Sequence, residues 1–444
     1  MGKRYFGTDG IRGVAGQFPL DRPTVHAFGR ALGRVLGARH GGGRVVLGMD
    51  TRESSPWIAE EVAGGLAAES VPVDSAGVTT TPGVAFLTHT GPYEAGVMIS
   101  ASHNPYRDNG LKVFGHSGYK LPDDEEHEIE EEMDRLRADG GGAPLRLTEQ
   151  DRLDRTYIDH LLSTLETQLD GLRIVLDCGN GAASHLAPEL FRRVGAEVAA
   201  IHASPDGRNI NNGCGALHVE DLQAQVVAHG ADLGVAFDGD ADRAIFVAGS
   251  GKVVNGDAVL LIAARHLAAA GNLPGRRVVA TVMSNFGLEQ ALAAEDIGMV
   301  RTPVGDKYVL EEMLRTGAAL GGEQSGHVIF LKHATTGDGM LTALRIAEIV
   351  RQSGESLEVL ASALQVFPQR LVNIRVREKR AIGEMPEVAA EIRECERALE
   401  GSGRVLVRFS GTEPLARVMV EAADASQVDH YCARIAGAIE RAIG

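Results

Sequence analysis

The feature that most constrains the fold is a recurring unit: a short apolar run, a polar turn and an amphipathic helical pattern. The apolar runs lie at residues 45–50, 174–179 and 278–283. Uniformly apolar strands are typical of parallel or mixed sheets that are buried on both faces. After the first run, Ile58 and Val62 stand four residues apart, as on the buried face of a helix. We therefore expect three similar mixed α/β units; one large α/β sheet with chance similarity is the alternative.

The pattern changes near Phe367 and Pro368. Beyond this point, apolar residues recur at every second position in residues 372–376, 405–409 and 416–420. Such alternation is typical of half-exposed antiparallel strands. Helical patterns lie between these runs and over residues 427–443, which predicts a smaller α+β domain. The length of 444 residues allows about two to four domains.

Composition excludes several classes of protein. The chain has 44 Lys and Arg against 60 Asp and Glu, a formal charge of −16 that opposes general binding to nucleic acid or anionic membranes. The N-terminal residues lack the apolar segment of a signal peptide, and the longest apolar run ends at Arg265, far short of a bilayer span. Four cysteines without CxxC spacing, at 178, 214, 395 and 432, favour reduced thiols in a core over disulfides or a zinc site. A cytoplasmic location is expected.

The first chemical motif is the run of residues 96–105. An apolar strand leads into small and polar residues, so Ser102 and His103 stand at a strand end, where open α/β sheets bind ligands. Downstream, residues 109–112 predict a turn, after which Lys112 could return to the same place. Plain turn-forming roles for the serine and asparagine remain the alternative.

The second motif comprises Asp238, Asp240 and Asp242, directly after an apolar run. Carboxylates at alternate positions repel each other unless a hard cation neutralises them, so a Mg²⁺ loop on the surface of a cleft is expected. An EF-hand is excluded because its sixth position, normally Gly, is Arg243 and its twelfth, normally Glu, is Gly249. A haloacid-dehalogenase-type phosphatase would prefer Thr or Val at the position of Asp242. A solvated acidic turn is the remaining alternative.

Two further loops carry polar groups suited to a phosphosugar. Glu323, Ser325 and His327 lie in a glycine-flanked loop whose donors and acceptors could bind vicinal hydroxyls. Near the C-terminus, hydroxyl residues and a glycine offer backbone N–H groups to an anion, with arginines on either side. The residues of this second loop are Arg408, Ser410, Gly411, Thr412 and Arg417. Either loop alone could be an ordinary polar turn.

Taken in order, five motifs resemble the α-D-phosphohexomutase superfamily, and within it the branch that acts on glucosamine phosphate. Residues 6–13 look like the family's opening, 100–105 like its phosphoserine loop, 238–243 like its metal loop, 323–327 like its sugar loop and 408–414 like its phosphate loop. One departure occurs at Ala216 and Leu217, where the family pattern has Ser and Thr. That stretch is not a catalytic loop in the family.

The resemblance implies an α/β fold of four domains around a central cleft. Three similar mixed α/β domains would span residues 1–153, 154–254 and 255–367, carrying the phosphoserine, metal and sugar loops in that order. A smaller α+β domain would span residues 368–444 and carry the phosphate loop.

The resemblance also implies the chemistry and the role of each site residue. Ser102, as phosphoserine, would pass its phosphoryl group between O6 and O1 of glucosamine phosphate, through a hexosamine 1,6-bisphosphate that is both intermediate and activator. One Mg²⁺ would be bound by Ser102 and the three aspartates. Arg12 and Lys112 would handle protons and stabilise charge, with His103 and Arg243 in support. The substrate would be bound by Glu323, Ser325, His327, Arg408, Ser410, Gly411, Thr412 and Arg417.

The implied partners are a phosphosugar, a second copy of the chain in a homodimer, and a protein kinase unless Ser102 is autophosphorylated; neither nucleic acid nor a membrane is expected. The reaction would supply UDP-N-acetylglucosamine and cell-wall precursors. A phosphomannomutase/phosphoglucomutase is the first alternative, although Gln324 stands where those relatives usually have Met. A metal-dependent sugar phosphatase is the second, and the phosphate loop argues against it, because hydrolysis needs no second phosphate site.

Overall fold

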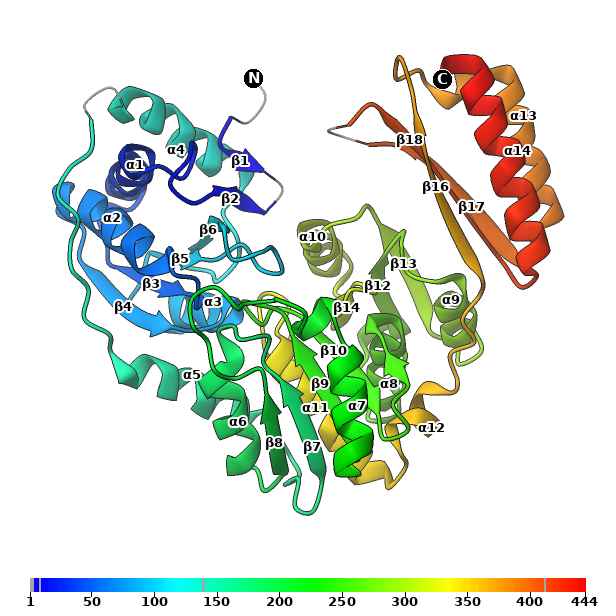
Figure 1. Ribbon diagram of the computed structural model, residues 1–444, viewed down its shortest axis with the longest axis horizontal. Coiled ribbons are helices and arrows are strands. Elements are labelled where there is room, and N and C mark those ends of the chain that lie inside the picture. Colours follow the sequence, from blue (N-terminus) through cyan, green and yellow to red (C-terminus); the bar gives the residue numbers. More distant parts are fainter. Residues whose placement is uncertain (1–3, 8, 138–139, 411–412) are drawn as a thin grey trace. The chain divides into compact units, whose positions relative to one another are not determined.

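The computed structural model describes the 444-residue chain except residues 1–3, 8, 138–139 and 411–412. The chain divides into two compact units (Figure 1). The larger comprises residues 1–282 and 300–361, and the smaller comprises residues 283–299 and 362–444.

The first sheet of the larger unit has the order β1-β2-β6-β5-β3-β4. Its strands are β1 (Phe6–Gly7), β2 (Gly10–Val14), β3 (Val45–Met49), β4 (Val73–Val78), β5 (Ala95–Ile99) and β6 (Asp108–Gly115). β3 runs parallel to β4 and β5, whereas β6 is antiparallel to β5 and β2. The turn predicted at residues 109–112 is wrong, because these residues lie within β6, where pairing of Asn109 and Gly110 with β2 outweighs the local turn preference of Asn-Gly.

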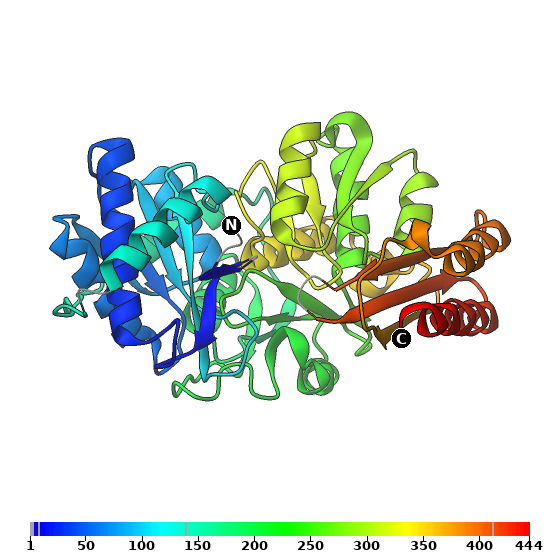
Figure 2. The ribbon, with the colours of Figure 1, turned by 90° about the horizontal axis from the view of Figure 1, so that it is seen from above.

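Helices cover both faces of this sheet: α1 (Arg22–His40), α2 (Ser55–Ala68), α3 (Thr81–Thr90), α4 (Asp123–Leu136) and α5 (Asp151–Ser163). Because side chains alternate along a strand, Val45 and Leu47 pack with α1, α2 and α4, and Val46 packs with α3 and α5. α1 contacts both α2 and α4 (Figure 2). The close approach of α1 and α2 depends on Gly65, where a Cβ would lie 2.3 Å from the carbonyl oxygen of His26.

The second sheet has the order β11-β10-β9-β7-β8. Its strands are β7 (Arg173–Asp177), β8 (Glu197–Ile201), β9 (Leu233–Phe237), β10 (Ala244–Ala248) and β11 (Val253–Val254), and its helices are α6 (Ala183–Arg193), η2 (Gly215–Leu217) and α7 (Glu220–His229). β9 is parallel to β7 and antiparallel to β10. Residues 238–243 therefore form a tight connection at the carboxyl end of a buried strand.

The rest of the larger unit repeats the α/β pattern. Parallel β12 (Arg277–Thr281) and β14 (Leu320–Gly322) are followed by antiparallel β15 (Val328–Phe330). The helices are α8 (Gly256–Ala269), η3 (Pro274–Arg276), α10 (Asp306–Thr316), α11 (Gly339–Ser353) and α12 (Leu357–Ala361), and β13 spans Gly298–Thr302. All three apolar runs thus lie in strands of mixed sheets, which confirms the predicted fold class.

The smaller unit is an antiparallel sheet covered by helices, which confirms the α+β prediction. Strands β16 (Gln369–Arg375), β18 (Leu415–Ala422) and β17 (Gly403–Phe409) lie in that order. The helices are α9 (Phe286–Ala293), η4 (Ile382–Glu384), α13 (Pro386–Ala398) and α14 (Ala425–Ile443). α13 and α14 lie on one face of the sheet (Figure 1), where Val418 and Val420 of β18 meet Cys395 and Cys432 in the core.

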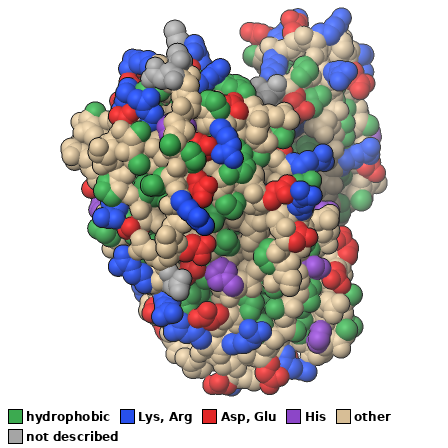
Figure 3. All heavy atoms as spheres, turned by 60° about the vertical axis from the view of Figure 1, so that its left-hand side comes forward, with side chains coloured by type: hydrophobic (Ala, Val, Ile, Leu, Met, Phe, Trp, Pro, Cys, Tyr) green, Lys and Arg blue, Asp and Glu red, His purple; other side chains and the backbone are tan. Residues whose placement is uncertain are grey.

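All four cysteines are free and buried, as expected for reduced thiols. No helix in the described part of the chain is long and apolar enough to cross a membrane. The face of the molecule drawn in Figure 3 carries acidic and basic side chains interspersed, without a continuous patch of one sign.

Candidate active site

Ser102 lies just beyond the carboxyl end of β5, in the larger unit. Its φ of +53° is in the left-handed region, which non-glycine residues seldom adopt and which marks a loop held in place by its surroundings. The residue is 1% exposed, and its Oγ donates a hydrogen bond of 2.6 Å to Oδ2 of Asp238. Nδ1 of His103 lies 3.3 Å from the same Oγ. The structure thus brings the predicted nucleophile to the predicted metal loop.

Buried polar side chains hold the backbone of the Ser102 loop. The guanidinium of Arg52 donates to the carbonyl oxygens of Ser102 and Asn104, at 2.9 and 2.8 Å, and pairs with Asp50 at 2.8 Å. Nδ2 of Asn211 also donates to the Ser102 carbonyl, at 2.9 Å. These donors therefore hold the backbone of a loop that is not part of a β-sheet.

The three aspartates of the metal loop converge. Each offers one carboxylate oxygen within 4.8 Å of the others. Asp240 Oδ2 accepts hydrogen bonds from Thr81 Oγ1 at 2.5 Å and from Lys112 Nζ at 2.8 Å. Gly239 in the same loop lies against the Ser102 carbonyl, which a Cβ would approach to 2.5 Å. The two loops are therefore packed directly on each other.

This triad is buried, so the expectation of a surface loop is wrong. The reason is that Thr81, at the start of α3, and Lys112, in β6 of the first sheet, cover it. Burial, followed by repulsion from Asp242 and Asp240, raises the pKa of Asp238 well above its usual range. For Asp242, burial opposes ionisation, but Lys112, His327 and Arg243 outweigh it and hold the pKa well below its usual range.

The triad fits a hard divalent cation. Oδ1 of Asp240 and Oδ1 of Asp242 are both buried and lack a hydrogen-bond partner among the described residues. Buried carboxylate oxygens without partners are costly, and Mg²⁺ prefers oxygen ligands of this kind. Asp238, Asp240 and Asp242 are therefore the residues that could hold the metal.

The predicted basic residues also reach this site. Lys112 of β6 is 1% exposed, and its Nζ lies 2.8 Å from Asp240, 3.4 Å from Asp242 and 3.3 Å from Asp9. Burial alone would lower the pKa of Lys112, but Asp240, Asp9 and Asp242 raise it well above its usual range, so the side chain is an ammonium. Arg12 of β2 pairs with the same Asp9.

Asp9 is the common partner of three cations. Besides Arg12 and Lys112, it accepts a hydrogen bond from Lys120, whose Nζ also lies 2.5 Å from Oδ2 of Asp306. Burial opposes the ionisation of Asp9, but the three cations hold its pKa far below its usual range. A cavity of about 280 Å³ adjoins this network and is lined by Gly7, Gly10, Lys112, Val113, Lys120, Leu121, Asp123, Glu126, Gly305, Asp306, Lys307 and Tyr308.

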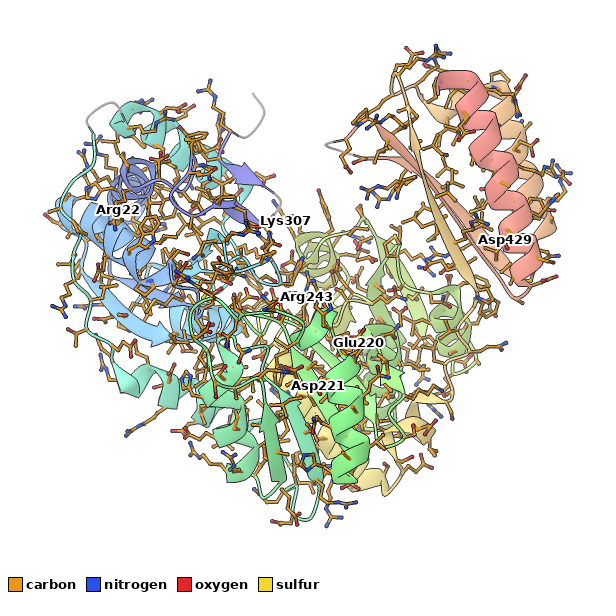
Figure 4. The ribbon with its side chains drawn as sticks, in the orientation of Figure 1. Arg22, Glu220, Asp221, Arg243, Lys307 and Asp429 are labelled. Atoms are coloured by element: carbon orange, nitrogen blue, oxygen red, sulfur yellow. The ribbon has the colours of Figure 1, made fainter. Side chains whose placement is uncertain are left out.

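His103 and Arg243, the two predicted supporting residues, flank Ser102 and the aspartates. Burial, then the positive charges of Arg243 and Arg12, lowers the pKa of His103, which favours its neutral form at neutral pH. Arg243, labelled in Figure 4, donates its backbone N–H to Asp238 Oδ1 at 3.1 Å. Its Nε lies 3.7 Å from Oδ1 of Asp242 and has no hydrogen-bond partner among the described residues.

The predicted sugar loop connects β14 and β15. Glu323 Oε2 accepts a hydrogen bond from Ser325 Oγ at 3.2 Å, and its Oε1 accepts one from the backbone N–H of Gly305 at 3.1 Å. The two side chains lie together and are only half-buried. They could therefore exchange these contacts for hydroxyl groups of a ligand.

His327 faces inward instead. It is buried, with Nδ1 3.8 Å from Asp242 and Nε2 3.9 Å from Asp306, and Nε2 accepts a hydrogen bond from the backbone N–H of Gly337 at 3.1 Å. Burial opposes its protonation, but Asp242 and Asp306 raise its pKa. These contacts make His327 a support for the metal loop, whereas its predicted contact with sugar stays a prediction.

The predicted phosphate loop lies in the smaller unit, between β17 and β18. Arg408 and Arg417 are directly opposite each other in the strand register, an unfavourable pair of like charges, although Arg417 also pairs with Glu413 at 3.1 Å. Burial, then repulsion from Arg417, lowers the pKa of Arg408. Ser410 is buried, and its Oγ accepts a hydrogen bond from the backbone N–H of Glu413 at 3.3 Å. Gly411 and Thr412 lie outside the described residues.

Sequence reasoning missed the residues that position the others. Arg52, Asn211, Lys120 and Asp306 carry no motif of their own and act through contacts with residues far away in the chain. Asp9 stands inside the opening motif, which by itself does not indicate its contacts with three cations. A weak signal existed for Arg52, since it follows Asp50 at the carboxyl end of an apolar run, where ligand-site residues collect.

Four family models match the chain in sequence order. All describe phosphoglucomutase/phosphomannomutase: alpha/beta/alpha domain I over residues 3–139, domain II over residues 155–251, domain III over residues 255–367 and the C-terminal domain over residues 371–438. The class is thus that of the phosphohexomutases. The boundaries predicted after residues 153, 254 and 367 stay predictions.

The sequences of curated relatives show to which family within this class the chain belongs. The chain is 63% identical over 445 residues to a phosphoglucosamine mutase of Solibacter usitatus, with all of both chains covered. It is 53% identical over 453 residues to that of Koribacter versatilis, covering all of this chain and 98% of the relative. The chain belongs to the phosphoglucosamine mutase family.

Solved structures show the same fold at low sequence identity. A phosphoglucomutase/phosphomannomutase family protein of Burkholderia thailandensis superposes with a TM-score of 0.84 at 24% identity, covering 99% of this chain and 97% of that one. The N-acetylphosphoglucosamine mutase of Aspergillus fumigatus, solved with GlcNAc-6P and magnesium, gives a TM-score of 0.69 at 19% identity, covering 99% and 96%.

Proposed function

We propose that this chain interconverts glucosamine 6-phosphate and glucosamine 1-phosphate, with Ser102 as the phosphoryl carrier. The observation that carries the proposal is the buried Ser102 Oγ, 2.6 Å from Asp238 and in the same site as Lys112. A nucleophile, a cation site and a fixed ammonium are what phosphoryl transfer requires. The full-length relatives named phosphoglucosamine mutase support the choice of substrate.

The reaction consists of two transfers at one site. In the first, the bond from phosphorus to Ser102 Oγ breaks and a bond to O1 or O6 of the sugar phosphate forms, giving hexosamine 1,6-bisphosphate. The sugar hydroxyl loses its proton and Ser102 Oγ regains one. The sugar then turns end for end, and the other phosphoryl group passes to Ser102 with the opposite proton change. The net reaction is an isomerisation with no proton gained or lost.

The side chains around Ser102 serve charge and orientation. Lys112 and Arg12 are the groups we assign to proton handling and to stabilising the charge of the transferring phosphoryl group, and Asp9 fixes both cations. When bound by the three aspartates together with Ser102, Mg²⁺ supplies neutralisation of phosphoryl oxygens. His103 and Arg243 support the nucleophile and the metal loop, respectively.

The substrate would be held at both ends. Glu323 and Ser325 would bind the 3- and 4-hydroxyls, because their present hydrogen bonds to Gly305 and to each other could be exchanged for sugar contacts. The phosphate that is not reacting would bind Arg408, Ser410, Gly411, Thr412 and Arg417. An anion there would relieve the repulsion between the two facing arginines.

The alternatives differ in product or in preferred sugar. Glucose, mannose and glucosamine share the 3- and 4-hydroxyls, so these contacts do not select the amino sugar. A comparison of kcat/KM for the three hexose phosphates, with Mg²⁺ and a trace of hexose bisphosphate, tests the assignment. A higher value for glucosamine phosphate supports it; an equal or higher value for glucose or mannose phosphate assigns the chain to phosphomannomutase/phosphoglucomutase, and release of free phosphate assigns it to the phosphatases.

The proposal includes the cellular setting predicted from the family resemblance. The first phosphoryl group on Ser102 would come from hexose bisphosphate by autophosphorylation or from a protein kinase. The chain would act in the cytoplasm as a homodimer. Its product would feed the synthesis of UDP-N-acetylglucosamine and cell-wall precursors. Intact-mass measurement of freshly purified chain tests whether Ser102 carries phosphate.

A further inference from the structure

A second group of side chains that could bind a metal lies at the edge of the second sheet of the larger unit, where β7 and β8 end. Asp177 ends β7, His202 follows β8, and Cys214 precedes the short helix η2. One ligand atom from each lies within 4.8 Å of the others. Unlike the aspartate triad, this group combines oxygen, nitrogen and sulfur donors.

The imidazole of His202 is placed as a metal ligand would be. Its Nδ1 lies 3.1 Å from Asp177 Oδ1, yet this buried atom makes no hydrogen bond within the described part of the chain. The nitrogen and the oxygen are thus close together without the geometry of a hydrogen bond, which is compatible with a cation bound by both. Zinc forms bonds of about 2.0–2.2 Å to such atoms, and two ligands of one zinc ion therefore lie at about this distance from each other.

A second carboxylate orients the ring. Oδ2 of Asp221, in the first turn of α7 (labelled in Figure 4), lies 3.3 Å from Nε2 of His202. A carboxylate at one ring nitrogen favours the proton there and leaves the other nitrogen free to bind a metal. This carboxylate–histidine arrangement accompanies most histidine ligands in metal sites.

The other two donors are held by backbone groups. Asp177 Oδ1 accepts the N–H of Gly179, and its Oδ2 accepts the N–H of Gly215, both at 2.9 Å. Each oxygen keeps a further lone pair. Cys214 is 1% exposed and free, and Nδ2 of Asn180 lies 3.8 Å from its Sγ. His202, 27% exposed, leaves a path to solvent on one side of the group.

We propose that Asp177, His202 and Cys214 form a second cation site, selective for a thiophilic divalent ion of the zinc class and distinct from the Mg²⁺ site. One sulfur, one nitrogen and one oxygen ligand match zinc chemistry, whereas Mg²⁺ takes oxygen ligands. Water would complete a tetrahedral shell.

The site would stabilise the support of the Ser102 loop. It joins the segments around residues 177–180 and 211–215, and Asn211 in the second segment donates to the carbonyl oxygens of Ser102 and Asn104. The proposal does not depend on which sugar phosphate the enzyme uses.

Cobalt(II) tests the site, because only a thiolate ligand gives a sulfur-to-cobalt charge-transfer band. The full chain is saturated with Mg²⁺ to fill the aspartate triad, and Co²⁺ is then titrated in. We expect one additional Co²⁺ per chain, the charge-transfer band, and loss of the band on adding Zn²⁺. Absence of the band from the wild-type chain would overturn the proposal and assign His202 to an ionic bridge between Asp177 and Asp221.

Variants locate the site. Cys214→Ser should remove the band, and His202→Gln should weaken Co²⁺ binding at least about tenfold. Cys432→Ser, another buried thiol but in the smaller unit, is the matched control and should retain the band. A band that persists in Cys214→Ser contradicts the proposal. If that variant does not fold, the His202→Gln comparison decides: unchanged Co²⁺ affinity overturns the assignment.

Discussion

Ser102 Oγ and Asp238 Oδ2 lie 2.6 Å apart, although 136 residues separate them in the chain. Ser102 follows β5 of the first sheet, and Asp238 follows β9 of the second sheet. The hydrogen bond therefore joins the loops at the carboxyl ends of these two strands. Ser102 and the predicted metal loop are therefore held together by the fold itself. This preorganisation lowers the cost of positioning the reacting groups.

The first prediction concerns pH and Asp238. Its pKa is raised in the folded chain, so the folded state binds the proton more tightly than the unfolded state, and without metal the free energy of unfolding falls as pH rises through the folded-state pKa. Asp238→Asn should remove this loss and give a higher Tm than wild type at pH ~7 in EDTA, by about 1 °C for each ~1 kcal/mol relieved, because the entropy of unfolding grows with chain length. Asp159→Asn, at an exposed ion pair with Arg193, is the control and should keep the wild-type pH dependence. Parallel Tm–pH curves for Asp238→Asn and wild type would contradict the prediction.

The second prediction concerns metal binding. Mg²⁺ at 100 times its Kd should stabilise the folded chain by about 2.7 kcal/mol, which would raise Tm by about 3 °C. Asp240→Asn removes one of the two carboxylates with a buried oxygen lacking a partner among the described residues, so the shift should largely disappear. Calorimetry with and without Mg²⁺ measures both. Mutase activity that survives complete chelation would show that the triad is not a functional metal site.

The third prediction concerns Lys120, which bridges Asp9 and Asp306. Lys120→Met leaves two carboxylates without this partner, at a cost of about 2 kcal/mol, and should lower kcat at least about tenfold because Asp9 also holds Lys112 and Arg12. Arg315→Met, which breaks an exposed pair with Glu312 on the same helix as Asp306, is the control and should change stability by less than about 0.5 kcal/mol. Urea unfolding and steady-state kinetics are the measurements. Equal effects of the two substitutions would refute a positioning role for Lys120.

The fourth prediction concerns the arginine pair of the phosphate loop. Arg417→Gln should raise KM for the sugar phosphate about ten- to a hundredfold, the range for loss of a charge-assisted hydrogen bond. It should change the stability of the ligand-free chain by less than about 1 kcal/mol, because it removes both the repulsion with Arg408 and an exposed ion pair with Glu413. Arg370→Gln, in the same sheet but paired with Asp429 at the surface, should leave KM unchanged. A KM that rises equally in both variants would point to damage to the sheet.

Much of this architecture was predictable because it depends on local patterns. The apolar runs set the strands, and polar residues after them mark strand ends, which placed Ser102 and Asp238 correctly. Lys112 was predicted to return to the site, although by way of a turn. That turn is absent because β6 pairs with β2 through Asn109 and Gly110, a long-range preference that the dipeptide does not show.

The supporting contacts were not predictable from local patterns. Arg52 stands next to Asp50 in the sequence, but its hydrogen bonds to Ser102 and Asn104 exist only after the first sheet has formed. The burial of Asp240 depends on Lys112 from another sheet. The inward orientation of His327 similarly follows from packing, since a loop of polar residues gives no sign of which side chain faces solvent.

The central claim, that Ser102 carries the phosphoryl group, is tested most directly by labelling. The chain is incubated with Mg²⁺ and hexose 1,6-bisphosphate bearing ³²P, and the labelled peptide is mapped. We predict label on Ser102, its transfer to added glucosamine 6-phosphate, and in Ser102→Ala both loss of label and a fall in mutase turnover of at least about three orders of magnitude. Label at another residue, or near-normal turnover by Ser102→Ala in the presence of bisphosphate, would contradict the account.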